Sequence, residues 1–435
     1  MTPAARIAAS IDLLAEIFRG AAPADALARE WFARRRYAGG GDRRAIRARV
    51  WDVLRRRGAL SWHVERAGGD GGDARALVLA GLALSDGLDA AGVTTLFDGA
   101  GYGAPPLSEA EAALVAALAG RRLDDPAMAD AARLNLPDWL LPLLDRAFGP
   151  AREAEMAALA GTAPVDLRTN LLKTSREAAQ AALAEAGVAA RPTPLSPLGL
   201  RLDAPVPLDA TPAFRDGLVE VQDEGSQLLA LAAAAQPGET VIDLCAGAGG
   251  KALALAAAMG NEGRLLACDV SAARLQRMVP RLRRAGAAIV EARPGDARAL
   301  LAEGAAPADR ADLVFVDAPC SGSGVWRRAP EDRWRLTPDR LAALVADQAA
   351  ILAAAAALVR PGGRLLYATC SVLAEENADI VDAFLDATPG FRRADARAAL
   401  PVAPAGNGPD LVLTPHRHGT DGVYAALLVR ERGHD

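Results

Sequence analysis

The spacing of apolar residues changes along the chain and divides it into three regions. Over residues 1–125, apolar side chains recur at helical spacing, as in the series Ile7, Ile11, Leu14 and Phe18. A residue that returns every three or four positions lies on one face of a helix, which can then pack against its neighbours. We therefore predict an all-helical N-terminal domain.

The second region, residues 126–235, carries mixed patterns. Val165–Thr169 alternates like a short strand, and Thr174–Glu177 matches a capping box that should begin a helix ending near Gly187. Pro192–Pro207 is rich in proline and is predicted to form turns. This region is predicted to be a linker and a small α+β module.

From residue 236 to 435 the pattern alternates between short apolar runs and alanine-rich helical stretches. Such alternation is typical of a mostly parallel, doubly wound sheet with helices on both faces, so the fold class is α/β. The predicted strands are Thr240–Cys245, Arg264–Asp269, Ala288–Arg293, Leu313–Val316 and Arg364–Thr369.

Polar residues gather at the ends of these predicted strands. In a doubly wound sheet, ligands bind beyond the carboxyl ends of the strands. The residues predicted at this edge are Asp243, Asp269, Asp296, Asp317, Cys320 and Cys370. We therefore expect the functional site there.

Composition limits the classes of protein that remain. The 435 residues are 51% hydrophobic and 24% charged, which excludes a disordered chain and leaves room for two or three domains. The four cysteines do not suggest a disulfide framework, so a reducing cytoplasm is expected. Asp12 and Glu16 interrupt the first apolar run, so no secretory signal is predicted, and Leu341–Val359 is expected to be a packed helix and not a membrane span.

The basic residues are unevenly distributed. Between Arg34 and Arg57 there are ten arginines against two acids, although the net charge of the chain is −5. This arginine-rich segment is either a solvated surface or a nucleic-acid contact. Lys173 and Lys251 are the two lysines among 49 basic residues, which reflects either codon usage or a specific need for an ammonium group at those positions.

A glycine-rich loop, Cys245–Lys251, follows the first predicted strand of the α/β region and opens a helix. Its backbone amides can approach an anionic group of a ligand closely. Asp269 lies about 20 residues further on, where an acid can hold ribose hydroxyls, so the spacing suits an adenosine cofactor. Asp296 either accepts a hydrogen bond from an adenine amino group or is a surface turn acid.

Two cysteines indicate covalent chemistry. Cys320 follows Asp317-Ala318-Pro319, and Cys370 lies between Thr369 and Ser371. A thiolate that adds to carbon 6 of a pyrimidine makes carbon 5 nucleophilic enough to accept a methyl group, and a second thiol can assist release. Cys245 and Cys268 are expected to pack in the sheet, and His416 and His418 lack ligands at the spacing of a zinc site.

These motifs resemble those of the RsmB/Sun (NOP2/NSUN) family of RNA 5-methylcytosine methyltransferases. The resemblance rests on Asp243–Lys251, Asp317–Gly324 and Thr369–Ser371, with further matches at Gln222–Gln227 and His416–Gly422. It covers roughly residues 160–430. The helical N-terminal domain is more weakly similar to the NusB-like RNA-binding domain of the bacterial branch.

The resemblance implies a Rossmann-like class I methyltransferase domain that uses S-adenosyl-L-methionine and acts on RNA in the cytoplasm. It implies that Cys370 is the nucleophile, that Cys320 promotes product release and that Asp317 contacts the cytosine. Lys173 and Lys251 would contact RNA, and no metal is implied. The cofactor would be held by Cys245, Ala246, Gly247, Ala248, Gly249, Gly250, Lys251, Asp269, Asp296 and Asp317.

The chain departs from the family pattern in the glycine-rich loop. Ala246-Gly247-Ala248 stands where the family has Ala-Ala-Pro, and Ala252 replaces its threonine. Ribosomal RNA is the favoured substrate. The alternatives are a tRNA cytosine-C5 methyltransferase and a catalytically silent RNA-binding assembly factor.

Overall fold

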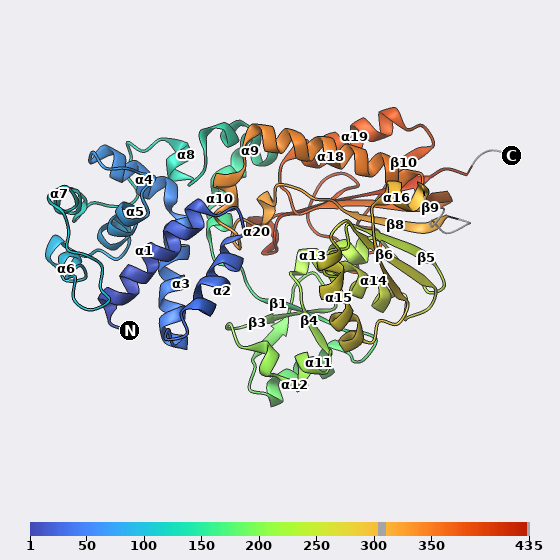
Figure 1. Ribbon diagram of the computed structural model, residues 1–435. Coiled ribbons are helices and arrows are strands. Elements are labelled where there is room, and N and C mark those ends of the chain that lie inside the picture. Colours follow the sequence, from blue (N-terminus) through green and yellow to red (C-terminus); the bar gives the residue numbers. More distant parts are fainter. Residues whose placement is uncertain (303–309, 433–435) are drawn as a thin grey trace. The chain divides into compact units, whose positions relative to one another are not determined.

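The computed structural model describes residues 1–302 and 310–432 and groups them into two compact units (Figure 1). The first, unit 1, consists of Met1–Gly161 and the separate segment Trp326–Thr337. The second, unit 2, begins at Thr162 and contains the remaining described residues. The predicted domain boundaries at residues 125 and 235 stay predictions. In the structure, residues 126–161 group with the helical unit.

Unit 1 is helical, as predicted for residues 1–125. Leu13 and Leu14, Trp31 and Ile46 are buried in one core, which explains the apolar spacing. Arg56 separates two successive helices, one ending at Arg55 and the next beginning at Arg57. The helices are α1 (Pro3–Arg19), α2 (Ala24–Arg34), α3 (Gly40–Arg55), α4 (Arg57–Arg66), α5 (Ala74–Ala80), η1 (Gly81–Ser85), α6 (Ala90–Thr94), α7 (Glu109–Leu118), α8 (Asp130–Arg133), η2 (Asp138–Leu140), α9 (Leu141–Phe148), η3 (Gly149–Ala151), α10 (Arg152–Ala160) and α17 (Asp332–Arg335).

The segment Trp326–Thr337 is tied into unit 1 by buried polar contacts. A carboxylate oxygen of Glu331 accepts the amide of Ala24 at 2.8 Å, at the first residue of α2. Arg333 is fully buried and donates to the carbonyl oxygen of Leu159 at 3.2 Å. Although this segment follows the Cys320 loop in the chain, it packs with the helical unit.

A small four-stranded antiparallel sheet begins unit 2. Its strands are β1 (Asp166–Thr169), β2 (Ala190–Pro192), β3 (Gly199–Leu202) and β4 (Val219–Val221), in the order β2-β3-β1-β4. The helix predicted from the capping box is α11 (Arg176–Glu185), but its N-cap is Ser175 and not Thr174. The prediction of turns throughout Pro192–Pro207 is wrong, because Leu200 packs in the core of this module and Gly199–Leu202 pairs with β1.

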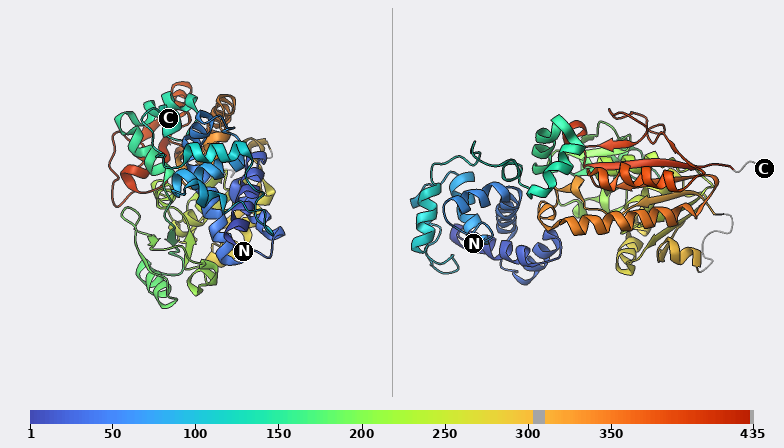
Figure 2. Two further views of the ribbon diagram at one scale, coloured as in Figure 1. Left: turned by 90° about the vertical axis from the view of Figure 1, so that its left-hand side faces the viewer. Right: turned by 90° about the horizontal axis from the view of Figure 1, so that it is seen from above.

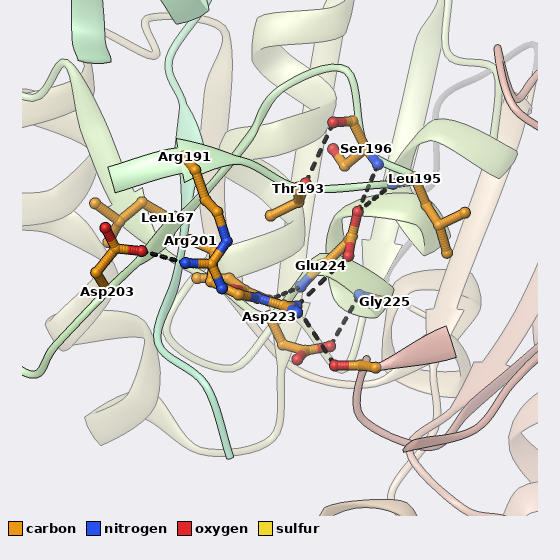
Figure 3. Close-up of polar contacts among 12 residues, drawn as sticks. Leu167, Arg191, Thr193, Leu195, Ser196, Arg201, Asp203, Asp223, Glu224 and Gly225 are labelled. Atoms are coloured by element: carbon orange, nitrogen blue, oxygen red, sulfur yellow. Dashed lines mark hydrogen bonds and ion pairs between the residues drawn. The ribbon is translucent and has the colours of Figure 1, made fainter. Parts of the chain in front are cut away.

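The motif Gln222–Gln227 joins this module to the rest of unit 2. It spans the start of α13 (Glu224–Ala232), and Figure 3 shows the Glu224 carboxylate directed at the backbone of Leu195 and Ser196. Its Oε1 accepts their amides at 2.5 and 2.8 Å. Asp223 accepts the amide of Asp421 at 3.1 Å, which connects this motif to His416–Gly422. Both motifs therefore have a structural role.

The large sheet of unit 2 confirms the predicted fold class. Seven of its strands lie in the order β10-β12-β9-β8-β5-β6-β7, and β11 pairs with β12. Strands β5 to β9 run parallel to one another, whereas β10, β11 and β12 form antiparallel pairs. The strands are β5 (Thr240–Leu244), β6 (Arg264–Asp269), β7 (Val290–Pro294), β8 (Ala311–Asp317), β9 (Val359–Thr369), β10 (Phe391–Ala394), β11 (Leu411–Leu413) and β12 (Val423–Arg430).

Helices cover both faces of this sheet (Figure 1, Figure 2). Val241 packs on one face with Met278 of α15, and its neighbour Ile242 packs on the other with Leu352 of α18 and Val381 of α19. Successive residues of these strands are buried on opposite faces of the sheet, so the strands are apolar throughout. The remaining helices of unit 2 are η4 (Leu208–Ala210), α12 (Pro212–Arg215), α14 (Gly250–Ala258), α15 (Ala272–Ala285), α16 (Ala297–Ala302), η5 (Ser323–Val325), α18 (Pro338–Ala356), η6 (Ala374–Glu376), α19 (Ala378–Ala387) and α20 (Pro415–His418).

Two features are absent from the described residues. None of their helices combines the length and apolar character needed to cross a membrane. No group of three or more His, Cys, Asp or Glu side chains within residues 1–302 and 310–432 is placed to hold a metal ion.

Candidate active site

The glycine-rich loop connects β5 to α14 with an unusual backbone. Cys245, Gly247 and Gly249 all have positive φ, at 62°, 57° and 85°. A Cβ on Gly249 would lie 2.4 Å from Cγ of Met278, so this position requires glycine. The turn is held by Arg281, which donates to the carbonyl of Ala248 at 2.6 Å.

Arg168, in the small sheet, contacts the same loop. Its Nη1 donates to the carbonyl oxygen of Gly250 at 2.9 Å. The side chain is fully buried, and the loss of hydration lowers the pKa of its guanidinium to about 10. Arg168 is therefore a positioning residue for the loop, a role that the sequence pattern did not show.

The strand-end acids lie beside this loop. Asp269, the last residue of β6, accepts the amide of Gly247 at 2.9 Å and that of Ser271 at 2.7 Å. Asp296 accepts the amide of Ala299 at 2.9 Å, in the first turn of α16. Each carboxylate still has unused lone pairs for a ligand.

A cavity of about 350 Å³ brings these residues together. Four predicted cofactor residues line it, namely Cys245, Asp269, Asp296 and Asp317. Its walls also include residues that the sequence did not point to: Val270, Arg274, Arg298, Asp347, Ala350, Ile351 and Ala354. Apolar walls with a few carboxylates fit an adenosine group, since a flat base covers the apolar atoms and the acids accept hydrogen bonds from hydroxyl and amino groups.

Val270 supports that fit most directly. Its side chain is 78% exposed although it is apolar and lies in the lining of the cavity. A planar aromatic ligand would remove this surface from water. The residues present therefore suit an adenosine cofactor, as the spacing of the loop and Asp269 predicted.

Asp243 differs from the other strand-end acids. It is fully buried within β5, and neither carboxylate oxygen accepts a hydrogen bond of ordinary geometry. Burial raises its pKa well above the usual range, and the nearby carboxylate of Asp317 adds to the effect. The raised pKa favours the protonated form of this side chain.

Lys251 and Asp317 form a short ion pair in the site. Lys251 is 8% exposed at the start of α14, and its ammonium lies 2.9 Å from Oδ2 of Asp317. Asp317 ends β8 and also lines the cavity. A buried cation is thus paired with a carboxylate of the cavity wall.

The two candidate catalytic thiols lie side by side, although 50 residues separate them. Sγ of Cys320 is 3.4 Å from Sγ of Cys370. Hydrogen bonding to Cys370 and burial raise the pKa of Cys320 well above the usual thiol range. The raised pKa favours the protonated form of Cys320, whose thiol can then donate to Cys370. Cys320 also directly follows Pro319, a residue of the cavity wall.

The other cysteines have surroundings unsuited to nucleophiles. Burial is the largest cause that raises the pKa of both Cys245 and Cys268 to about 12. Thiols that stay protonated are poor nucleophiles.

A close approach of two glycines supports the thiol loops. A Cβ on Gly324 would lie 1.9 Å from the carbonyl oxygen of Gly422, whose amide donates to Gly324 at 2.8 Å. The amide of Gly324 donates in turn to the carbonyl of Cys370 at 3.0 Å. The motif His416–Gly422 is therefore part of the frame that holds both cysteines. His418 accepts the amide of Thr414 at 3.0 Å, which gives it a structural role.

Lys173 lies in a different environment. Its ammonium donates to the backbone carbonyls of Asp216 at 2.8 Å and Arg284 at 2.6 Å. These contacts make it an anchor between segments of unit 2. Its contact with RNA stays a prediction.

Comparisons with known proteins identify the same motifs. Residues 230–429 match the family described as 16S rRNA methyltransferase RsmB/F, and residues 136–209 match the ferredoxin-like domain of RsmF/B-like methyltransferases.

Individual relatives cover more of the chain. The probable ribosomal RNA small subunit methyltransferase B of Synechocystis is 34% identical over 70% of this chain and 69% of its own. The ribosomal RNA small subunit methyltransferase B of Salmonella typhi is 35% identical over 71% of this chain and 69% of its own. The crystal structure of PH0851 superposes with a TM-score of 0.77 at 27% identity and covers 98% of this chain and 99% of that one.

Proposed function

The chain belongs to the RsmB/F family of methyltransferases, and we propose that it methylates carbon 5 of a cytosine in ribosomal RNA through a covalent cysteine adduct. The observation that carries this proposal is the pair of thiols 3.4 Å apart next to a cavity suited to adenosine. A methyltransferase that acts on an exocyclic amine needs no thiol, whereas attack at a ring carbon does.

The cofactor is S-adenosyl-L-methionine, as the resemblance implied and the family now confirms. It supplies an electrophilic methyl group and leaves as S-adenosylhomocysteine. We assign its binding to the loop 245–251 with Asp269, Asp296 and Asp317. In this assignment Asp269 holds the ribose and Asp296 faces the adenine.

Cys370 is assigned the role of the nucleophile. Its sulfur bonds to carbon 6 of the cytosine, and the electron pair of the C5–C6 double bond moves toward carbon 5, which then takes the methyl group. Cys320 is assigned to support this role, because a protonated Cys320 thiol that donates to the Cys370 sulfur would favour the thiolate of Cys370.

Release breaks two bonds and restores a double bond. The proton on carbon 5 leaves to a base, its electron pair restores the C5–C6 double bond, and the bond between carbon 6 and Cys370 breaks. Cys320, within 3.4 Å of that sulfur, is assigned to promote this step. Asp317 and Lys251 are assigned to the polar edge of the base, where their ion pair can stabilise a change in its charge.

We assign the substrate from the descriptions of related proteins and not from the geometry of the site. The Synechocystis and Salmonella relatives are described as ribosomal RNA small subunit methyltransferases, and we extend that substrate to this chain, with the cytoplasm as its location. Transfer RNA is the second candidate within the same chemistry. The hydrogen-bonded thiol pair disfavours a silent assembly factor, which would have no use for it.

Single cysteine variants test the covalent mechanism. Cys370→Ala should be inactive and should leave RNA free on a denaturing gel, because no carbon–sulfur bond can form. Cys320→Ala should accumulate a protein–RNA species that survives denaturation, because release is slowed. Mass spectrometry of small-subunit RNA and tRNA, each incubated with labelled S-adenosylmethionine, identifies the substrate class and the methylated carbon.

The double variant serves as the control. Adding Cys370→Ala to Cys320→Ala should abolish the stable species. If Cys370→Ala traps RNA and Cys320→Ala does not, the two roles are reversed. If neither traps RNA and both remain active, the covalent mechanism is wrong.

A further inference from the structure

Glu376 is a fully buried acid close to the two thiols. It is the last residue of η6, the short helix that follows Cys370 in the chain. None of the roles assigned above uses it. A carboxylate buried to this degree is costly unless hydrogen bonds compensate its charge, so its contacts indicate what it does.

On one side Glu376 holds the loop of Cys320. Its Oε1 accepts the amide of Ser321 at 2.7 Å, and its Oε2 accepts the hydroxyl of the same serine. Ser321 directly follows Cys320 in the chain. Both oxygens of one carboxylate therefore fix the residue next to the first thiol.

On the other side the same carboxylate holds the loop of Cys370. The hydroxyl of Ser371, the residue after Cys370, donates to Oε2 at 2.5 Å. Gln348 of α18 donates to Oε1 at 3.0 Å and also to the carbonyl of Pro319 at 2.9 Å, just before Cys320. One carboxylate thus connects the residues that flank both cysteines.

These donors take the place of an ion pair. Within residues 1–302 and 310–432, Glu376 has no arginine or lysine partner, so four hydrogen bonds compensate its charge. The titratable groups near it include the thiols of Cys320 and Cys370 and the phenol of Tyr367, whose hydroxyl donates to the Glu376 carbonyl at 2.7 Å. Its negative charge also contributes to the raised pKa of Cys320, after the effects of Cys370 and of burial.

We propose that Glu376 is a positioning residue that sets the distance between the two catalytic thiols and keeps Cys320 protonated until release. The catalytic part of this inference rests on the proposed function, but the effect on the thiols does not. A carboxylate serves both tasks, because it accepts hydrogen bonds from two loops at once and its charge opposes a thiolate beside it.

The first experiment measures the thiols without RNA or cofactor. Full-length wild type and Glu376→Gln are alkylated with iodoacetamide across a pH series, and the modification of Cys320 and Cys370 is quantified by peptide mass spectrometry. Glutamine keeps the shape and removes the charge, so the alkylation midpoint of Cys320 should move to lower pH. An unchanged midpoint would overturn the electrostatic part of the proposal.

The second experiment measures catalysis by Glu376→Gln and Glu376→Ala. Loss of the hydrogen bonds in Glu376→Ala should lower kcat by roughly ten- to a hundredfold, because reacting groups tolerate little displacement. KM for RNA should stay within about twofold, and Glu376→Gln should recover part of the rate, since its amide still links both loops.

Asp312→Asn is the matched control. Asp312 lies near the opposite end of β8 from Asp317 and accepts the amide of Thr240 at 2.8 Å and a bond from Arg360 at 2.6 Å. This variant also removes a charged acceptor from the sheet, yet it should leave Cys320 alkylation and kcat unchanged. If the Glu376 variants match Asp312→Asn in both assays, Glu376 is only a structural residue. A wild type that methylates no RNA would instead refute the proposed function and leave the thiol titration interpretable.

Discussion

The thiol loops of unit 2 and the arginine-rich segment of unit 1 both stand out in the sequence, but the structure treats them differently. The thiols occupy a buried frame in which Ser321, Ser371 and Glu376 are bonded to one another. The arginines lie along α3 and the residues on either side of it, where acids from other helices reach several of them. The serines beside the thiols share one buried carboxylate, whereas the charges of the arginine-rich segment are partly neutralised by acids from other helices.

Ion pairs account for five of the ten arginines in this segment. Their partners are Glu16 for Arg34, Asp12 for Arg35, Asp25 for Arg47, Asp86 for Arg49 and Asp52 for Arg56. Four of these acids lie outside the segment, so the local excess of eight positive charges falls to four. Such exposed pairs add little stability, but they reduce the charge available to a phosphate backbone.

Substituting one glycine in each region gives the largest contrast. In Gly324→Ala the added Cβ would meet the Gly422 carbonyl at 1.9 Å, so the backbone of the thiol loops must move. Methyltransferase activity should fall roughly a hundredfold, by the same sensitivity to displacement, and stability by about 1–3 kcal/mol. Initial rates and urea unfolding measure the two effects.

Gly41→Ala is the counterpart in the arginine-rich segment. Nothing lies within 4 Å of the added Cβ, and Gly41 is in the first turn of α3. Alanine should therefore stabilise the protein slightly, by at most about 1 kcal/mol, and leave activity unchanged. Equal effects of the two substitutions would contradict the rigid frame inferred for the thiols.

The pH dependence of stability should differ between two buried acids, one in each unit. The pKa of Asp243 is raised in the folded protein, so unfolding above a pH of about 4 releases a proton from this side chain. The free energy of unfolding therefore falls as pH rises from about 4 toward the raised pKa. Asp243→Asn removes this dependence. It should stabilise the protein by about 1–3 kcal/mol at pH 8, and by less at pH 5.

Asp42 in α3 should behave in the opposite way. Arg6 donates to the Asp42 carboxylate at 2.8 Å and lowers its pKa. The stability that ionised Asp42 contributes is therefore fully present above its pKa in the unfolded chain and is lost as pH falls through its lower pKa in the folded protein. Asp42→Asn should therefore destabilise the protein at both pH 5 and pH 8. Urea denaturation of both variants at each pH measures the signs, and stabilisation by Asp243→Asn that does not grow with pH would refute a protonated Asp243.

The sequence predicted what short-range patterns determine. The strand ends, the glycine-rich loop and the acids Asp269 and Asp317 follow from alternation and spacing, and the cavity brings them together as expected. The short strand β3 was missed because proline and glycine surround it, and its pairing with β1 came from residues more than thirty positions away.

What the sequence could not predict depends on contacts between distant residues. Glu376 contacts Ser321 across 55 positions, and Gly422 meets Gly324 across a still longer separation that no local period encodes. The packing of Trp326–Thr337 into unit 1 belongs to the same class. It also changes how RNA binding should be tested, since a chain without the first 125 residues would lose Ala24, the hydrogen-bond partner of Glu331.

The smallest predicted effect concerns RNA binding by the full chain. Arg36 and Arg44 are exposed, and the described part of the chain gives neither of them an ion-pair partner. If the arginine-rich segment binds RNA, these two side chains are the ones free to reach phosphates. Arg36→Ala with Arg44→Ala should weaken binding and reduce the slope of log K against log salt by about one for each phosphate that an arginine no longer neutralises.

The control removes a neutral pair from the same surface. Arg34→Ala combined with Glu16→Ala leaves the net charge unchanged, because the two side chains are 2.5 Å apart and cancel each other. Its salt slope should equal that of the wild type. Fluorescence anisotropy with a labelled fragment of small-subunit RNA, titrated at several salt concentrations, measures all three slopes. Equal slopes for all three proteins would mean that the arginine-rich segment is a solvated surface. Unit 2 would then carry the chemistry, and the arginine-rich segment of unit 1 would take no part in binding RNA.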